Sequence, residues 1–256
     1  MNLGKERRIS RIINGADENT IIVPMDHGIT LGPIKGIAAI KETIRQLAKT
    51  EVDGIILHKG IISACEEELR KSDLALIMHL SASTCLSTSS GYKTTVGTVE
   101  EAVWFGCDGV SVQVNIGDEQ EYRMLSEAGK AAGDCYKYGM PLLAMMYARG
   151  PKTGNERSLE MVEHAARVGA ELGADLVKVN YCGDPKAFEE VVKGCPVPVI
   201  IAGGKKVESE KAFLQEVKEA MTTGIRGLSV GRNVFQSNNM PELIHEIHKL
   251  VHLKEF

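Results

Sequence analysis

Short apolar runs recur along this chain, and a longer amphipathic stretch follows each of them. The runs are rich in β-branched residues and end in glycine or polar residues, as strands do. We predict eight strands, at Thr20–Met25, Gly54–His58, Ala75–Leu80, Gly109–Asn115, Pro141–Tyr147, Asp175–Asn180, Val197–Ala202 and Gly227–Val230. The intervening stretches repeat apolar residues with helical spacing, most clearly in Ile37–Thr50, Glu119–Tyr138, Ser158–Leu172 and Ser209–Thr223.

This alternation is compatible with few folds. Glycine separates a predicted helix from the next strand in ELGAD, KYGMP and TTGIRG, where it can end the helix with a left-handed residue. Strands that are separated by helices run parallel, and strands covered by helices are apolar on both faces, as these are. Eight such units in about 230 residues fit an α/β fold of the (β/α)8 TIM barrel type better than an open doubly wound sheet.

Two segments lie outside the regular pattern. Asn2–Asn14 precedes the first strand, and we interpret it as a short N-terminal helical extension whose basic residues, Lys5 to Arg8, form a solvated face. The segment SASTCLSTSSGYKTTVGT follows the third strand, and its polar composition predicts an extended loop. No linker rich in Pro, Gly or Ser divides the chain, so we expect residues 1–256 to form a single barrel domain.

The composition argues against several classes of function. The net charge of −4 and the scattered basic residues give no reason to expect nucleic-acid binding. No segment approaches the roughly 18 continuous apolar residues of a membrane span, and no apolar signal-peptide core follows the N-terminus. The six cysteines show no CxxC spacing, and several have apolar neighbours, as reduced core cysteines do. We therefore expect a cytoplasmic protein without membrane association.

Polar residues that end strands are the candidate site residues, because active sites of (β/α)8 barrels lie at the carboxyl ends of the strands. Most of the predicted strands end in this way, which a barrel without a site would not need. The candidates are Asp26, His27, His58, Lys59, His79, Gln113, Asn115, Tyr147, Arg149, Lys178, Asn180, Tyr181, Lys205 and Arg232. Among those after the first two strands, we expect His27 and Lys59 to bind substrate.

The last two strands end in similar loops. VPVIIAGGKK places Gly203 and Gly204 beside a lysine, and GLSVGRNVF places Gly231 beside Arg232. Glycine allows backbone N–H groups to approach an anion, and the N-terminus of a following helix attracts negative charge. Barrels frequently bind phosphate in these two loops, so we predict a phosphate site here. The alternative is that these are glycines of ordinary turns.

Lys178 lies in the middle of the apolar run ADLVKVNY. Strand alternation places it on one face with Leu176 and Asn180. An ammonium group that faced the outer helices would be buried against apolar side chains at a high cost, so the barrel mouth is the more tolerable position. Partial burial there lowers the pKa of a lysine, and a neutral amine can attack a carbonyl group to form a Schiff base. A structural lysine that pairs with a carboxylate is an equally good reading of the strand position alone.

Two further strand ends favour the catalytic reading. Schiff-base chemistry needs groups that transfer protons, and Asp26 and Tyr147 could do so beside Lys178. Taken alone, Asp26 in MDHG could form a turn or cap a helix, and Tyr147 could be an aromatic residue of the barrel rim.

Five segments of the chain resemble a known family. The residues IIVPMDHGITLGPIKGI, LLAMMYARG, GAELGADLVKVNYCGD, VKGCPVPVIIAGGKK and GLSVGRNVFQ are similar to those of the DhnA-type class I aldolases, over nearly the whole chain. The resemblance implies a (β/α)8 barrel in which Lys178 forms the imine, Tyr147 is the general acid/base and Asp26 assists. It also implies a large homo-oligomer, often a decamer in this family, no cofactor besides the lysine imine, and phosphate binding by Gly203, Gly204, Gly231 and Arg232.

The family resemblance implies a phosphorylated ketose and an aldehyde as substrates. The expected reaction is a transaldolase-type exchange, in which a three-carbon unit held on Lys178 passes to L-aspartate semialdehyde. The alternative within the family is the reversible cleavage of fructose 1,6-bisphosphate to dihydroxyacetone phosphate and glyceraldehyde 3-phosphate. The chain departs from the family pattern in the segment HLSASTCLS and at three positions that we expect in the substrate pocket, Gln113, Ala148 and Val179.

Two other functions compete with this one. A zinc-dependent aldolase could use the polar residues after the early strands, namely Asp26, His27, His58 and His79. These residues lack close i, i+2 spacing, and no cysteine cluster accompanies them, so we expect no metal site. A non-catalytic barrel that binds phosphosugars would keep the glycine loops but would not need the lysine, the tyrosine and the aspartate together.

Overall fold

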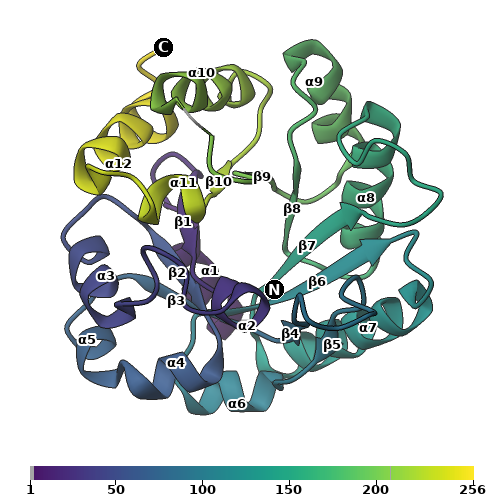
Figure 1. The fold of residues 1–256 in the computed structure, drawn as a ribbon, viewed down its shortest axis with the longest axis horizontal. Helices are drawn as coiled ribbons and strands as arrows, with labels where there is room; N and C mark the ends of the chain where they lie inside the picture. Colours follow the sequence, from purple (N-terminus) through teal and green to yellow (C-terminus); the bar gives the residue numbers. More distant parts are fainter. Residues whose placement is uncertain (1–2, 208) are drawn as a thin grey trace.

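The computed structural model describes residues 3–207 and 209–256. Within them, eight parallel strands close into a barrel in the order β1-β10-β9-β8-β7-β6-β3-β2, with helices outside (Figure 1). The (β/α)8 prediction is confirmed, and each barrel strand coincides with a predicted one. The strands are β1 (Thr20–Pro24), β2 (Gly54–Leu57), β3 (Ala75–His79), β6 (Gly109–Ile116), β7 (Leu142–Ala148), β8 (Leu176–Asn180), β9 (Val199–Ala202) and β10 (Gly227–Ser229).

Helices connect the strands and cover the outside of the barrel (Figure 1). The four helices predicted with bounds are present, and each is shorter than its predicted range because turns form at its ends. Gly139, Gly173 and Gly224 have positive φ, as predicted for helix-ending glycines. In the described residues the helices are α1 (Leu3–Ile12), α2 (His27–Leu31), α3 (Ile40–Leu47), α4 (Lys59–Ala64), α5 (Glu66–Arg70), α6 (Val99–Trp104), α7 (Glu121–Tyr138), α8 (Leu159–Glu171), α9 (Pro185–Gly194), α10 (Glu210–Met221), α11 (Arg232–Phe235), α12 (Met240–His248) and the π-helix η1 (Lys249–Leu253).

Alternate residues of each strand pack on opposite sides of the barrel wall. Leu176 belongs to the inner core, whereas Val177 and Val179 belong to the outer core between strands and helices. The N-terminal helix α1 is present as predicted, although Asn2 lies outside the described residues. Its Ile12 joins the inner core, and the Ile12 carbonyl accepts a hydrogen bond from Thr20 Oγ1 at 2.6 Å. Helix α1 therefore covers the amino end of the barrel.

Three aspartates precede the strands β2, β6 and β8. The carboxylates of Asp53, Asp108 and Asp175 each accept a hydrogen bond from a backbone N–H of the neighbouring strand, at 2.6 to 2.9 Å. Asp108 also pairs with Arg11 of α1, and Asp175 pairs with Lys5 of α1, both at 2.7 Å. The prediction that the basic face of α1 is solvated is therefore wrong for Lys5, whose side chain is only 13% exposed.

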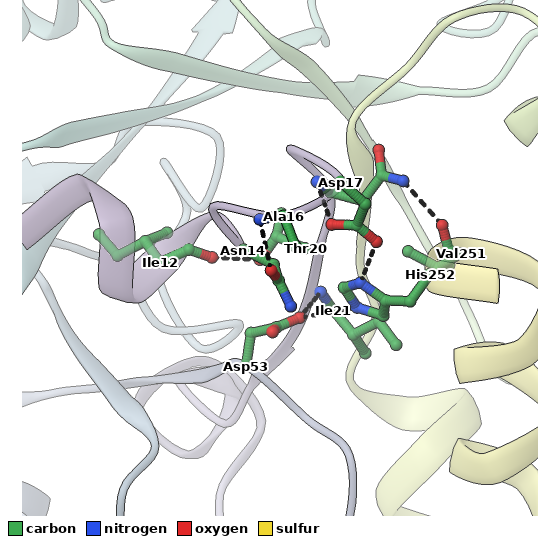
Figure 2. A network of polar contacts seen from close by, with 10 residues as sticks. Ile12, Asn14, Ala16, Asp17, Thr20, Ile21, Asp53, Val251 and His252 are labelled. Carbon is green, nitrogen blue, oxygen red and sulfur yellow. Dashed lines mark hydrogen bonds and ion pairs between the residues drawn. The ribbon is translucent and has the colours of Figure 1, made fainter.

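The remaining aspartate, Asp53, takes part in a contact between the two ends of the chain (Figure 2). The His252 ring of η1 lies between two carboxylates, with Nδ1 at 2.7 Å from Asp17 and Nε2 at 3.1 Å from Asp53. Burial would lower the pKa of His252, but its hydrogen bonds to Asp53 and Asp17 and their charges raise it. A protonated His252 therefore holds η1 against the amino ends of β1 and β2.

The extended segment predicted after β3 is present. It contains a short antiparallel pair that the sequence did not predict, β4 (Ser81–Ala82) and β5 (Thr94–Thr95). Four cysteines are buried, as expected of reduced core cysteines, at positions 65, 107, 135 and 195. None of the helices in the described ranges combines the length and the apolar character of a membrane-spanning helix.

Candidate active site

A cavity of about 250 Å³ opens at the carboxyl ends of the barrel strands. Its lining includes residues from β7, β8, β9 and β10, from α2, and from the extended segment after β3. The structure thus brings together most of the residues predicted from strand ends, namely Asp26, His27, Tyr147, Lys178, Gly203, Gly204, Gly231 and Arg232.

Lys178 points into the barrel, as strand alternation predicts, and its side chain is almost completely buried. Its neighbours in register are Met145 of β7 and Ile200 of β9, both of the inner core. Burial lowers the pKa of Lys178 to about 8, while the charge of Asp26 opposes the shift. Roughly one molecule in ten then carries the neutral amine at pH 7, the form that attacks a carbonyl carbon.

Asp26 occupies the N-cap position of α2, as the alternative reading has it, but its side chain makes no capping hydrogen bond. Its carboxylate lies 3.4 Å from His27 Nδ1 and 3.7 Å from His79 Nε2. Burial would raise the pKa of Asp26, but the nearby His79, His27 and Lys178 together lower it to about 2. The carboxylate is therefore ionised at neutral pH, in electrostatic contact with Lys178.

His79 lies behind Asp26, away from the lining of the cavity. Its Nδ1 is 2.8 Å from Ser111 Oγ, and its ring makes an edge contact with His58. Burial lowers the pKa of His79 to about 3, so its ring is neutral at pH 7. In the described part of the chain, no three His, Cys, Asp or Glu side chains are arranged to hold a metal ion.

Tyr147 is the penultimate residue of β7, and its side chain lines the cavity and is 7% exposed. The Arg149 guanidinium lies over its ring at 4.2 Å from the centroid, and Glu156 pairs with that guanidinium at 2.6 Å. Burial raises the pKa of Tyr147, so the phenol remains protonated at neutral pH and can donate a proton.

The two glycine loops approach each other closely. A Cβ atom on Gly231 would lie 2.6 Å from the Pro24 carbonyl oxygen and 2.8 Å from His27 Cε1, so a side chain there would collide with the end of β1. Arg232 Nη2 donates a hydrogen bond to the Gly204 carbonyl at 2.9 Å and thereby joins the loops after β9 and β10. Their backbone is thus exposed to the cavity beside a guanidinium, an arrangement suited to an anion.

Several polar atoms of the cavity wall have no hydrogen-bond partner among the described residues. Buried polar groups in proteins are almost always hydrogen-bonded, so a group of unsatisfied ones indicates a polar ligand. Among the described residues, the buried atoms without a hydrogen-bond partner include four in this wall, His27 Nδ1, Asn180 Nδ2, Ser229 Oγ and Arg232 Nε.

Some predicted residues lie elsewhere. Lys59 begins α4 outside the cavity, and its ammonium pairs with Glu101 of α6 at 2.6 Å. Tyr181 packs against Phe188 in the outer core. Val179 also belongs to the outer core, so the expectation that it lies in the substrate pocket is wrong.

The other two positions that depart from the family pattern, Gln113 and Ala148, differ in whether they face the cavity. Gln113 lines the cavity, whereas Ala148 does not, because it follows Tyr147 on β7 and has the opposite orientation.

The lining residues that the sequence analysis missed include Lys93 and Ser229. Lys93 reaches the cavity from the extended segment after β3, where nothing distinguishes it from a basic residue of a surface loop. Ser229 is the central residue of the run Leu228–Ser229–Val230, and a hydroxyl in so short an apolar run is the signal that could have revealed it.

Comparison with known proteins identifies the family. The model of the DeoC/LacD family aldolases matches residues 20–237. The chain belongs to this family. It is therefore a class I aldolase, from a family of enzymes that form a Schiff base with substrate, as the sequence motifs predict.

Relatives of known name and structure agree with this assignment. The 2-amino-3,7-dideoxy-D-threo-hept-6-ulosonate synthase 1 of Archaeoglobus fulgidus is 44% identical over 98% of this chain and 92% of the relative. The 2-amino-4,5-dihydroxy-6-oxo-7-(phosphonooxy)heptanoate synthase of Streptomyces griseus is 38% identical over 96% and 89%. An archaeal fructose-1,6-bisphosphate aldolase, solved with its catalytic lysine covalently bound to a carbinolamine intermediate, superposes with a TM-score of 0.89 at 32% identity, covering 96% of this chain and 99% of that chain.

Proposed function

We propose that this aldolase transfers a three-carbon unit from a phosphorylated ketose to L-aspartate semialdehyde. The names of the two synthases both describe a seven-carbon amino acid with a ketone at C6. Such a chain forms when the α-carbon of a three-carbon ketone attacks a four-carbon amino-acid aldehyde. The observation that carries the proposal is the buried Lys178, whose lowered pKa makes part of it a nucleophile at neutral pH.

In the first half of the reaction, the Lys178 amine attacks the ketone carbon of the donor. The carbinolamine loses water, and the product is a protonated imine. The carbon–carbon bond beyond the α-carbon then breaks as its electron pair moves toward the imine nitrogen. The hydroxyl of the departing fragment loses its proton and becomes an aldehyde, and the three-carbon unit remains on Lys178 as an enamine.

In the second half, the enamine carbon attacks the aldehyde carbon of the acceptor. The aldehyde oxygen takes up a proton and becomes a hydroxyl group. Water then hydrolyses the imine, which restores the Lys178 amine and returns the water lost in the first half. Tyr147 is the main proton-transfer group, and Asp26 assists carbinolamine breakdown and binds substrate hydroxyl groups.

The glycine loops bind the donor phosphate. Gly203, Gly204 and Gly231 present backbone to the cavity, and Arg232 supplies positive charge and an unpaired Nε donor. Interaction at this distant group positions the reacting carbons near Lys178. His27 adds a polar atom to the same wall. The reaction uses the lysine imine in place of a cofactor, and we expect the protein to act as a homo-oligomer in the cytoplasm.

Reversible cleavage of fructose 1,6-bisphosphate is the second candidate. The archaeal aldolase with the lysine-bound carbinolamine shares the fold over nearly all of this chain, and that reaction would use the same imine chemistry. The two candidates share the enamine intermediate on Lys178 and differ in the aldehyde that it attacks.

One experiment tests both candidates. The protein is incubated with fructose 1,6-bisphosphate, dihydroxyacetone phosphate or 6-deoxy-5-ketofructose 1-phosphate, with and without L-aspartate semialdehyde, and products are measured by mass spectrometry. We expect a seven-carbon amino acid only when the semialdehyde is present. Cleavage of fructose 1,6-bisphosphate without any such product would support the second candidate instead.

A substitution tests the mechanism. Lys178→Met is nearly isosteric and removes the nucleophile, so the variant should fold but lose activity by several orders of magnitude. Borohydride with donor should add mass to the parent at Lys178 and none to the variant. Near-normal turnover by Lys178→Met would contradict the imine mechanism.

A further inference from the structure

Lys93 is a cation of the cavity that the proposed mechanism does not use. It is half-buried, and its ammonium donates a hydrogen bond to Ser83 Oγ at 2.6 Å. Within the described part of the chain its ammonium makes no direct ion pair, although the Asp26 carboxylate acts on it at longer range. A partly desolvated ammonium beside a hydroxyl favours binding of an anion, because an anion would supply the missing opposite charge.

Hydrogen bonds hold Lys93 in place from both sides. Before it, the Gly91 carbonyl accepts a hydrogen bond from Asn115 Nδ2 of β6 at 2.5 Å. After it, the Thr95 N–H donates to Glu127 of α7 at 2.6 Å. Its partner Ser83 also donates to the Ser90 carbonyl at 2.8 Å. Lys93 is therefore a preorganised cation and not a mobile loop residue.

The barrel order places Lys93 opposite the glycine loops. In the closed ring, β9 and β10 are each four strands away from β3 and β6, respectively, and β4 and β5 lie on the β6 side of the barrel (Figure 1). Lys178 on β8 and Tyr147 on β7 lie between these two sides. A donor phosphate at the glycine loops would thus leave the side of Lys93 for the second substrate.

The two guanidinium groups that line the cavity, those of Arg149 and Arg232, already have partners. Glu156 pairs with Arg149, which lies over the Tyr147 ring. Arg232 belongs to the glycine loops through its bond to the Gly204 carbonyl. On the side opposite those loops, Lys93 is the cavity-lining cation without a carboxylate partner in the described residues.

We propose that Lys93 binds the carboxylate of the acceptor and thereby selects an amino-acid semialdehyde over a neutral aldehyde. The inference rests on the proposed function, in which the acceptor is such a semialdehyde. The Lys93 ammonium has three N–H donors, and the one used by Ser83 Oγ leaves two for the two oxygens of a carboxylate. A phosphate group has three free oxygens and is better matched by successive backbone N–H groups such as those of the glycine loops.

The test compares acceptors in a Lys93→Met variant. The parent is first measured with a ketose phosphate donor and either L-aspartate semialdehyde or butanal, a neutral aldehyde of the same chain length. In Lys93→Met, kcat/KM for the semialdehyde should fall by about 10-fold to 100-fold, mainly through KM, because a charged hydrogen bond is lost. The value for butanal and the borohydride trapping of donor at Lys178 should not change, which also shows that the variant is folded.

Two further variants sharpen the result. Lys93→Arg keeps the charge and should retain most of the preference for the semialdehyde. Lys71→Met removes the same charge from an exposed residue at the end of α5, where Lys71 pairs with Glu67, and should behave as the parent does.

Failure of the inference and failure of the proposed function look different. No transfer to L-aspartate semialdehyde by the parent would contradict the proposed function and this inference together. Parent-like selectivity in Lys93→Met, or an equal loss with both acceptors, would overturn the inference alone. So would a loss of donor trapping, which would assign Lys93 to the donor.

Discussion

At the scale of single residues, Lys178 and Asp26 control the charge of the cavity. Burial lowers the pKa of the Lys178 ammonium to about 8, and Asp26 limits that shift by stabilising the charged form. The carboxylate itself is ionised across the neutral range, with a pKa of about 2. The amine is therefore neutral often enough to react, and Asp26 balances the charge of Lys178 when the lysine is protonated.

Removing the Asp26 charge should shift this balance. In Asp26→Asn the stabilisation of the ammonium is lost, so we expect the pKa of Lys178 to fall below about 8. The pH profile of borohydride trapping with a ketose phosphate should move to lower pH, although turnover should fall, because we propose that Asp26 assists later steps. Asp184→Asn, at the cap of α9 outside the cavity, serves as the control. A midpoint that is unchanged or higher would contradict the prediction.

The proposed roles of Tyr147 and Lys178 can be distinguished by experiment, because they belong to different steps of the reaction. Tyr147→Phe keeps the ring under the Arg149 guanidinium but removes the phenolic proton. We expect turnover to fall by about 10²-fold to 10⁴-fold, the usual range for a lost general acid or base, while some trapped imine still forms. Turnover at the parent rate would assign proton transfer to another group.

At the scale of elements, the amino end of the barrel depends on aspartates that precede strands. Asp53, Asp108 and Asp175 each hold a backbone N–H of the neighbouring strand and a cation from one end of the chain. The same carboxylate thus fixes strand pairing and docks α1 or η1. This end contributes stability, while the opposite end holds the site, the division of roles that is usual in such barrels.

The contact of His252 with two carboxylates makes part of this stability depend on pH. Because the pKa of His252 is raised in the folded protein, its contribution is fully present below the unfolded value of about 6.5 and is lost as pH rises through the folded value. His252→Gln should therefore destabilise the protein most at low pH, by about 1–3 kcal/mol.

Thermal unfolding of the parent and of His252→Gln, measured at several values from about pH 5.5 to about pH 9, checks this sign. The difference in unfolding free energy should shrink as pH rises. His245→Gln is a suitable comparison, because His245 pairs with Glu51 in a more exposed position. A constant or growing difference for His252→Gln would contradict the assignment.

At the scale of the whole molecule, the sequence predicted the barrel well because its pattern is local. Each strand is a short apolar run and each helix has its own periodicity, so eight repeats are visible without knowledge of their contacts. The same alternation placed Lys178 inside the wall. Position after a strand end was less informative for Lys59, because the direction of such a residue depends on the helix that follows, and α4 turns Lys59 toward Glu101.

The family match alone could not separate pocket residues from their neighbours. Of the three positions at which the chain departs from the family pattern, Gln113 lines the cavity, while Val179 and Ala148 do not. Alternation along a strand separates them, since residues on either side of an inward one face the helices.

The amino-acid sequence predicted the fold class and the end of the barrel where the candidate site lies, and its family resemblance indicated Lys178 as the imine-forming residue. Local periodicity and strand-end position carry the information on the fold and on the end of the barrel. The three-dimensional contacts were needed to show that Lys93 lines the cavity, that Lys59 does not, and that His252 connects η1 to the amino ends of β1 and β2. Those facts depend on contacts between residues far apart in sequence, and periodicity contains no record of such contacts.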